Sequence, residues 1–436
     1  MSSAGHRNPC AHHRRRPSVT SCVVCAAPLC RDCVVHTPVG FKCSSCTTRV
    51  VAAPSEARSI GRGRRIGSLV AVAVLISGGV AAYGLSRRGS GGGTVYARPS
   101  QGSVTDPVPI DQAVRFAGAG GLQIGADLMS PPGVGHRSPG VLIVPDTGSV
   151  DRNGPASPGE ISDPLYQDLA QGLAQKGMSS LRYDPRGQGE STLPAGTPLR
   201  LSDLVDDAKG GLQFLSRRED VDAGHLAVLG EGAGGLVALQ LAAEDPTVKA
   251  LVLVSTPGRP MPASLADGVR AAAPTPAEGD ALAAQLQSVA AAVAAGAPVP
   301  GPAQLPSALR PIFPSGEDAF LRSLFSFDPL GIARSVHVPV LLVRGSADPS
   351  NTAADAQALV TALGPRAQLI VADQANHTLN IVSVGPVGGV ASPTGSHVSN
   401  MTGRAIVVRD TATLTAIAEW VGAQVRAAPM GTPPEH

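Results

Sequence analysis

A run of twenty residues without a charged side chain, Ile66 to Leu85, is the feature that most restricts how this 436-residue chain can fold. At 1.5 Å per residue, a helix of this length is about 30 Å long, which matches the hydrocarbon core of a bilayer. Arginines bracket both ends of the run, which disfavours the alternative of a helix buried in a globular core. We therefore predict one membrane-spanning helix at residues 66–85.

The charges around this span predict its orientation. Four arginines lie within residues 58–65, whereas only Arg87 and Arg88 follow the span closely. Because Lys and Arg accumulate on the cytoplasmic side of a membrane helix, we expect a cytoplasmic N-terminus and an extracytoplasmic C-terminal domain at the cell membrane. Residues 86–110 are rich in Gly, Ser and Pro and are predicted to form a flexible linker.

The cysteines predict a metal-binding module at residues 5–48. All seven lie before the span, as expected for thiols kept on the reducing side of the membrane. Cysteine and histidine occur in four pairs with two intervening residues, a spacing at which a tight turn can point two ligands at one ion. Eight ligands suffice for two structural Zn²⁺ ions, which a short segment with little core needs in order to fold. The candidate ligands are Cys10, His13, Cys22, Cys25, Cys30, Cys33, Cys43 and Cys46.

The alternative to a zinc site is a set of reduced thiols without a metal. His12 and His36 are further candidate zinc ligands, but each can equally be a histidine exposed to solvent. The segment resembles a B-box-type zinc finger, in particular the short form before the membrane core of some bacterial rhomboid proteases. The resemblance rests on the eight positions and on VGFKC before the last pair. It implies interleaved ligand pairs, although spacing alone leaves the pairing open. No ligand position looks open, so we expect a structural module that contacts a cytoplasmic protein partner.

Residues 111–428 alternate short apolar runs with amphipathic stretches. Continuous apolar runs separated by helices are typical of an α/β fold, in which a mostly parallel sheet is covered by helices on both faces. Sites in such sheets lie at the carboxyl ends of the strands. The predicted strands include two antiparallel ones within 113–130 and runs at 140–145, 226–230, 250–256, 338–345 and 367–373. The predicted helices include 166–177, 201–218, 233–244, 280–296 and 411–425.

Composition excludes several classes of function. The net charge of +2 rules out a uniformly basic nucleic-acid binder, although residues 1–88 carry +11 and residues 89–436 carry −9. With 7 Phe, 4 Tyr and 1 Trp, the chain has too few aromatic side chains for a base-stacking platform. No nucleotide-binding glycine motif is visible, and the residues after the span show no pattern of metal ligands.

The C-terminal region resembles the α/β-hydrolase family over nearly all of residues 111–428. The resemblance rests on RYDPRGQGES, LGEGAGGLVALQLA, VPVLLVRGSADPSNTAADAQAL and QANHTLN, in the family's order of nucleophile turn, acid and histidine. The loop sequence DRNG is similar to that of exported bacterial esterases and lipase-like hydrolases. The resemblance implies an esterase or lipase-like fold, with a lid often placed where residues 257–328 lie.

The resemblance also implies the site residues. The family's G-x-S-x-G motif corresponds to Gly-Glu-Gly-Ala-Gly at 230–234, so the nucleophile position is Gly232, which has no side chain. Asp348 takes the acid position and His377 the base position. The implied oxyanion donors are the backbone N–H groups of Ala233 and of Thr147 or Gly148.

Three interpretations of the missing serine remain open. The domain can be a degenerate hydrolase that binds a ligand or a partner. Alternatively Ser149 or Glu231 attacks the substrate, although the side chain before the nucleophile usually points away. In the third, His377 and Asp348 activate a water in the space left at Gly232. Alternatively, Asp348 caps the helix that follows its turn. His377 can likewise be a histidine whose hydrogen bonds are satisfied within a polar loop, without a catalytic role.

The leading hypothesis is a membrane-anchored, degenerate esterase or lipase used for ligand or partner binding. Small, non-aromatic residues at 257–328 favour an apolar or acyl ligand. The alternative is an active hydrolase of ester or acyl substrates that uses His377 and Asp348 without a serine. Nearby Arg182, Asp184 and Arg186 are expected to stabilise the fold.

Overall fold

The computed structural model describes residues 108–133, 137–148, 150–155, 163–194, 196–383 and 406–427, together with the backbone of five short strands within 20–42 and 95–97. The chain divides into two compact units, Met1–Arg65 and Ile66–His436. Within the described residues, no helix is both long and apolar enough to cross a bilayer. The predicted span at 66–85 lies outside them, so it stays a prediction.

In the first unit, the described backbone forms two antiparallel strand pairs, β1 (Thr20–Ser21) with β2 (Pro28–Leu29) and β3 (Val35–Thr37) with β4 (Gly40–Lys42). All eight predicted zinc ligands lie outside the described residues. The zinc module therefore also stays a prediction.

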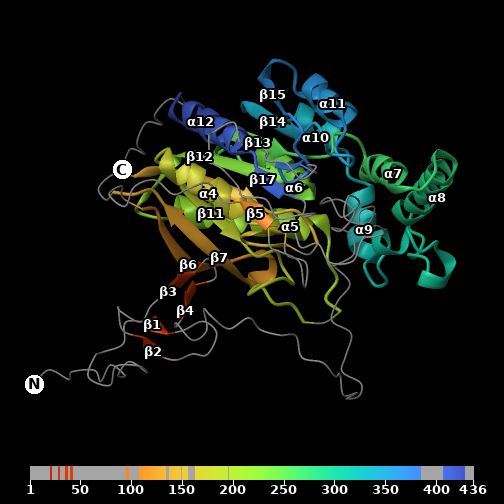
Figure 1. Ribbon diagram of the computed structural model, residues 1–436, viewed down its shortest axis with the longest axis horizontal. Helices are drawn as coiled ribbons and strands as arrows, with labels where there is room; N and C mark the ends of the chain where they lie inside the picture. Colours follow the sequence, from red (N-terminus) through yellow and green to blue (C-terminus); the bar gives the residue numbers. More distant parts are fainter. Residues whose placement is uncertain are drawn as a thin grey trace, which may run out of the picture. The chain divides into compact units, whose positions relative to one another are not determined.

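The second unit is built on an eight-stranded sheet (Figure 1). Its strand β7 runs antiparallel to both neighbours, and the other neighbouring strands are parallel. This arrangement confirms the prediction of a mostly parallel sheet with an antiparallel pair at its start. In order across the sheet, the strands are β15 (Ala367–Ala372), β14 (Val340–Gly345), β13 (Val248–Val254), β12 (Val221–Glu231), β8 (Ser138–Val144), β11 (Ser179–Tyr183), β7 (Gln123–Ser130) and β6 (Ile110–Ala117).

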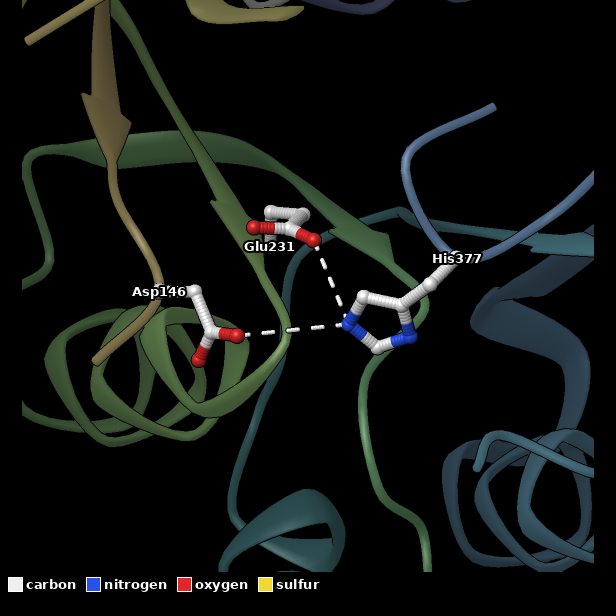
Figure 2. A group of neighbouring side chains, drawn as sticks. All are labelled: Asp146, Glu231 and His377. Carbon is white, nitrogen blue, oxygen red and sulfur yellow. Dashed lines mark ion pairs between the residues drawn. The ribbon is translucent and has the colours of Figure 1, made fainter. Parts of the chain in front are cut away.

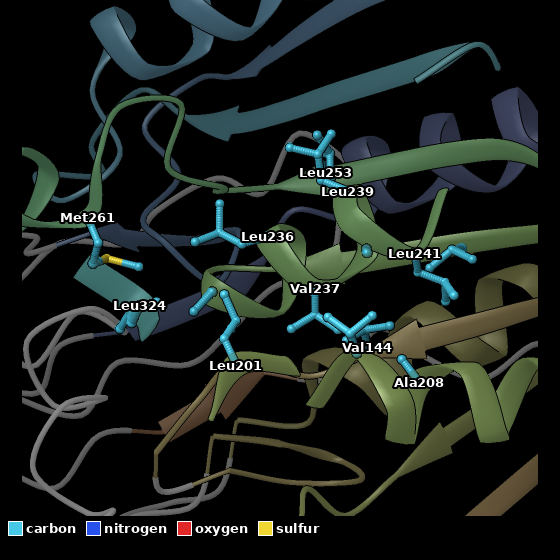
Figure 3. Close-up of a cluster of buried hydrophobic side chains, with 14 of the residues drawn as sticks. Val144, Leu201, Ala208, Leu236, Val237, Leu239, Leu241, Leu253, Met261 and Leu324 are labelled. Carbon is cyan, nitrogen blue, oxygen red and sulfur yellow. The ribbon is translucent and has the colours of Figure 1, made fainter. Parts of the chain in front are cut away.

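The apolar runs form central strands because both faces of the sheet are buried. In β8, Leu142 and Val144 belong to one hydrophobic core, whereas Val141 and Ile143 belong to the core on the opposite face. Because side chains alternate between the two faces of a strand, one continuous apolar run contributes residues to both cores. Figure 3 shows Val144 within the first of these cores.

Helices cover each face as the sequence predicts. On the face of Val141, α4 (Leu165–Gln175) packs against α12 (Thr411–Ala427). The opposite face is covered by α5 (Leu201–Ser216), α6 (Ala233–Glu244), α10 (Pro329–Arg334) and α11 (Ala353–Leu363).

Residues 257–328, the region where a lid is expected, contain three further α-helices. Figure 1 shows them grouped on one side of the sheet. They are α7 (Met261–Ala272), α8 (Pro276–Ala294) and α9 (Asp318–Phe325). The single-turn 3₁₀ helices of the domain are η2 (Ala119–Gly121), η3 (Pro302–Gln304), η4 (Arg310–Ile312) and η5 (Gly364–Arg366).

Two small sheets were not predicted. The hairpin of β9 (Val150–Asp151) and β10 (Gly154–Pro155) follows β8. A three-stranded sheet joins β16 (Asn380–Ser383), β17 (Ile406–Arg409) and β5 (Val95–Ala97). Strand β5 falls within residues 86–110, for which the sequence predicts only a flexible linker.

Candidate active site

The turn between β12 and α6 has the form of a strand–turn–helix elbow centred on Gly232. Its backbone angles of φ 57° and ψ −128° suit glycine, because a side chain is strained there. Helix α6 starts directly afterwards, at Ala233, whose N–H group points toward the loop after the neighbouring strand β8.

The space above this glycine is filled by Asp146, which comes shortly after β8. A Cβ atom placed on Gly232 would lie 2.4–2.6 Å from the three atoms of the Asp146 carboxyl group. The carboxyl oxygen Oδ1 accepts hydrogen bonds of 2.7 Å from the backbone N–H groups of both Thr147 and Ala233. Two of the predicted oxyanion donors are thus occupied by the chain itself. The expectation that Gly232 leaves room for a water is wrong, because Asp146 takes that room.

The predicted acid and base residues meet as expected. Nδ1 of His377 lies 2.7 Å from Oδ2 of Asp348, and both side chains are buried. The other oxygen of Asp348 accepts hydrogen bonds from the backbone N–H groups of Ser350 and Asn351. Asp348 therefore both caps the turn that follows it and orients the imidazole ring.

Glu231 points into the site rather than away from it, contrary to the expectation for the residue before the turn. Its Oε1 lies 3.2 Å from Nε2 of His377, and Oδ2 of Asp146 lies 4.0 Å from the same nitrogen (Figure 2). The Tyr166 hydroxyl, on α4, donates a 2.7 Å hydrogen bond to Oε2 of Glu231 and accepts one from the backbone N–H of Asp146. Tyr166 thereby links the two carboxyl residues.

Burial and mutual charge shift the pKa of all three groups around Nε2. Burial raises the pKa of Asp146, against the opposing effects of His377 and the two backbone N–H groups. Burial and the charge of Asp146 raise the pKa of Glu231 to about 8. Burial lowers the pKa of His377, but Asp348 and the two other carboxylates outweigh it and raise that pKa to about 10. Near neutral pH the imidazole is therefore protonated.

A small pocket with a cavity volume of about 20 Å³ lies beside Asp146 and Thr147. Most of its lining is apolar and comes from α5, α6 and α9 and the loops after β8 and β11. The lining residues are Val144, Pro145, Asp146, Thr147, Gly148, Tyr183, Pro185, Arg186, Gln188, Leu199, Leu204, Val237 and Phe320.

The three charged residues expected to stabilise the fold are themselves buried and form ion pairs. Arg182 pairs with Asp111 and Asp127, Asp184 pairs with Arg152, and Arg186 pairs with Asp207, all at 2.5–3.1 Å. This prediction is confirmed.

Sequence reasoning missed two residues of the site. Asp146 follows the apolar run at 140–145, and the rule that sites form at the carboxyl ends of parallel strands could have identified it. Tyr166 carries no comparable signal, because its position on α4 predicts only a core residue. Ser149 lies outside the described residues.

Parts of this chain are similar in sequence to known proteins. Residues 162–290 match the family model described as "Serine aminopeptidase, S33". The esterase EstD of Thermotoga maritima is 26% identical over 246 residues, which cover 55% of this chain and 54% of that protein. The uncharacterised protein PA2218 of Pseudomonas aeruginosa is 32% identical over 143 residues, or 32% of this chain and 35% of that protein. The chain thus spans about half or less of these relatives.

Two solved structures are also similar. The crystal structure of PA2218 has a TM-score of 0.44 and 20% identity, covering 62% of this chain and 87% of that one. The esterase domain of a Rhodothermus marinus protein has a TM-score of 0.44 and 17% identity, covering 73% and 98%. From the strand order, the elbow between β12 and α6 and the sequence matches, we conclude that the domain built on the eight-stranded sheet has the α/β-hydrolase fold.

Proposed function

We propose that this domain is an esterase-like or lipase-like hydrolase domain that has lost serine catalysis and binds a ligand with an apolar or acyl part. The single observation that carries the proposal is the position of the Asp146 carboxyl group. It occupies the space of the nucleophile side chain and accepts the hydrogen bonds of the oxyanion donors.

The nucleophile position supports this proposal first. Gly232 stands where the family places its serine, and in the described part of the chain no hydroxyl group is hydrogen-bonded to the imidazole of His377. The Ser255 hydroxyl instead donates to the backbone carbonyl of His377. A serine there would bring its Cβ within 2.4 Å of the Asp146 carboxyl carbon. Asp146 and a serine nucleophile are therefore incompatible without a shift of the chain.

The oxyanion donors support the proposal independently. Acyl transfer by a serine requires backbone N–H groups aimed at the oxygen that becomes negative in the transition state. Here the N–H groups of Thr147 and Ala233 already bind Oδ1 of Asp146. A substrate oxygen would have to displace this carboxyl oxygen, and the carboxylate charge would repel the developing oxyanion.

The protonation of His377 also argues against catalysis by this residue. A general base must be unprotonated when the reaction starts. Because the pKa of His377 is raised to about 10, the ring carries a proton at neutral pH. The His377–Asp348 hydrogen bond favours the alternative of a non-serine hydrolase. However, a protonated His377 cannot take a proton from water.

The apolar pocket supports ligand binding. Leu199, Leu204, Val237 and Phe320 line it, next to Asp146. Such a lining suits the hydrocarbon part of an acyl compound, although the pocket, at about 20 Å³, must widen to admit it. The proposal also includes a cytoplasmic zinc module, which we expect to bind a protein partner, and a membrane span at 66–85. The cysteine spacing supports the zinc module, and the charge distribution supports the orientation of the span.

The loss of serine catalysis is tested on the purified full-length chain with a fluorophosphonate probe and p-nitrophenyl esters. We expect no labelling and no hydrolysis beyond that of a His377→Ala variant. Gly232→Ser alone should stay unlabelled, whereas Gly232→Ser combined with Asp146→Gly should be labelled, because only the double variant frees both the space and the donors. Wild-type hydrolysis that His377→Ala abolishes would instead favour the active alternative.

Ligand binding is tested with a fluorescent fatty acid. Leu204 is half-buried and lines the pocket, so Leu204→Gln should weaken binding about tenfold through the loss of apolar contact. Leu282→Gln is the matched control, because Leu282 is also half-buried but lies on α8 away from the pocket lining. Equal affinity for wild type and Leu204→Gln would place the ligand elsewhere.

A further inference from the structure

We propose that Asp146, Glu231 and His377 together bind one divalent transition-metal ion, of the kind that accepts carboxylate oxygen and imidazole nitrogen, such as Mn²⁺ or Zn²⁺. This inference goes beyond the proposed ligand binding and does not depend on it. It concerns the centre shown in Figure 2, where two carboxyl groups approach the same ring nitrogen.

The geometry suits three ligands of a single ion. Oδ2 of Asp146, Oε1 of Glu231 and Nε2 of His377 all lie within 4.8 Å of one another, and the two carboxyl oxygens lie 4.0 and 3.2 Å from the nitrogen. Oxygen and nitrogen ligands bind Zn²⁺ at about 2.0–2.2 Å, so two ligands of one ion are separated by up to about 4 Å. The outer limit of 4.8 Å exceeds this separation, so a carboxyl group must rotate slightly about its existing hydrogen bonds for all three atoms to bind one ion.

The three atoms are among the buried polar atoms of the described residues that make no hydrogen bond. Their polar contacts within the described residues are the ion pairs of Nε2 with the two carboxyl oxygens, at 3.2 and 4.0 Å. A buried polar atom without a partner is costly, and the convergence of three such atoms on one point needs a physical reason. A metal ion between them would satisfy all three at once.

Every other polar atom of these side chains is held by a neighbour. Oδ1 of Asp146 accepts from two backbone N–H groups, Oε2 of Glu231 accepts from Tyr166, and Nδ1 of His377 is hydrogen-bonded to Asp348. A carboxylate on the far nitrogen of a histidine is the usual support of a metal-bound imidazole. The surrounding residues therefore fix the orientation of all three ligand atoms.

The charges call for a cation. Among the described residues, His377 is the one positively charged group that forms ion pairs with Asp146 or Glu231. Together with Asp348, the site holds three buried carboxyl groups against a single imidazole. A divalent ion would displace the proton from Nε2 of His377 to solvent, bind the neutral imidazole and balance the charges of Asp146 and Glu231. Three protein ligands would leave a coordination position open for water.

Protons shared among the same groups are the competing explanation, and metal binding distinguishes the two. The purified full-length chain is treated with a chelator, dialysed and titrated with Mn²⁺, and free Mn²⁺ is measured by electron paramagnetic resonance. Mn²⁺ prefers oxygen and nitrogen ligands, so the predicted cysteine sites do not compete. We expect one Mn²⁺ per wild-type chain and a rise in melting temperature upon binding.

The variants assign the ion to these residues. Glu231→Gln and Asp146→Asn keep the shape and the supporting hydrogen bonds but should each weaken Mn²⁺ binding at least tenfold. Asp280→Asn, at an exposed carboxylate, should bind Mn²⁺ as wild type does. Melting curves without metal show whether each variant is folded, so that misfolding is not mistaken for loss of a ligand.

Zinc content provides the second measurement. Chains loaded with Zn²⁺ should contain one more ion per chain in the wild type than in Glu231→Gln, whatever the cysteine module binds. If the wild type exceeds Glu231→Gln in neither Mn²⁺ nor Zn²⁺, the metal site does not exist and shared protons explain the cluster. Labelling of the wild type by a serine probe would contradict the proposed function and leave this result unaffected.

Discussion

At the scale of single residues, Asp146 and Asp184 use the same kind of hydrogen bond to opposite effect. Both carboxyl groups are buried and accept backbone N–H groups. Asp184 in addition pairs with Arg152 at 2.6 Å, whereas the charged neighbours of Asp146 are one histidine and other carboxyl groups. Burial raises the pKa of each, but for Asp184 the hydrogen bonds from Arg152 and Glu190 outweigh burial and lower its pKa overall. The charged form of Asp184 therefore stabilises the fold, whereas burial of the charged form of Asp146 destabilises it.

Replacing Asp184 should consequently weaken the fold in a pH-dependent way. A carboxyl group whose pKa is lowered on folding contributes stability above its unfolded pKa, and the contribution disappears as the pH falls through the folded value. We expect Asp184→Asn to lower the free energy of unfolding by about 3 kcal/mol at pH 7, because it leaves the Arg152 charge short of a partner. Urea unfolding at pH 7 and pH 3 should show a smaller difference in the free energy of unfolding between wild type and Asp184→Asn at pH 3.

The control for this experiment is Asp220→Asn, which breaks the exposed pair between Arg218 and Asp220. Exposed pairs contribute about 0–1 kcal/mol, so this variant should unfold nearly as the wild type does. Equal losses for the two variants would show that burial of the Arg152–Asp184 pair does not matter.

At the scale of elements, helix α6 must approach the sheet closely to place the elbow. A Cβ atom on Gly235 would lie 1.9 Å from the Thr256 hydroxyl oxygen, which follows β13. In α4, by contrast, a Cβ atom on Gly172 would meet nothing nearer than 4.0 Å. Two glycines within helices thus have different roles, since one permits close packing and the other only adds conformational freedom.

Alanine substitution at these two glycines should change stability in opposite directions. Gly235→Ala is expected to destabilise the protein by about 2–3 kcal/mol through overpacking between α6 and Thr256. Gly172→Ala should stabilise it by up to about 1 kcal/mol, because alanine favours the helix. Thermal unfolding of both variants measures the difference. A stabilising Gly235→Ala would mean that α6 packs less closely than described.

At the scale of the whole molecule, local patterns predicted the sheet and half of the site. The run at 140–145 and the order of the motifs sufficed for the strands and for the pairing of His377 with Asp348. The strand-end rule could have placed Asp146 near the elbow. The convergence of the Asp146 and Glu231 side chains on His377 was not predictable, because it depends on side-chain directions at two neighbouring strand ends. The pairing of β5 with β17 joins segments some three hundred residues apart, and no local pattern encodes such a contact.

The same scale carries the remaining prediction, the orientation of the chain across the membrane. Residues 1–88 carry +11 and residues 89–436 carry −9, and all cysteines lie before residue 66. If the arginines at 58–65 hold the N-terminus in the cytoplasm, alkaline phosphatase fused after the α/β-hydrolase domain should be active, since its disulfides form only outside the cytoplasm.

A chain with these arginine charges neutralised provides the comparison for this fusion. Replacing the four arginines within 58–65 by glutamine removes the charge excess on the N-terminal side, so phosphatase activity should fall as a fraction of the chains inverts. Replacing Arg14, Arg15 and Arg16 instead should leave activity unchanged, because these residues lie about 50 positions before the span, beyond the distance at which flanking charges act. An inactive phosphatase in the unmodified chain, with a fluorescent cytoplasmic reporter at the same end, would place the hydrolase-like domain inside the cell and remove the compartment argument for its lack of cysteine.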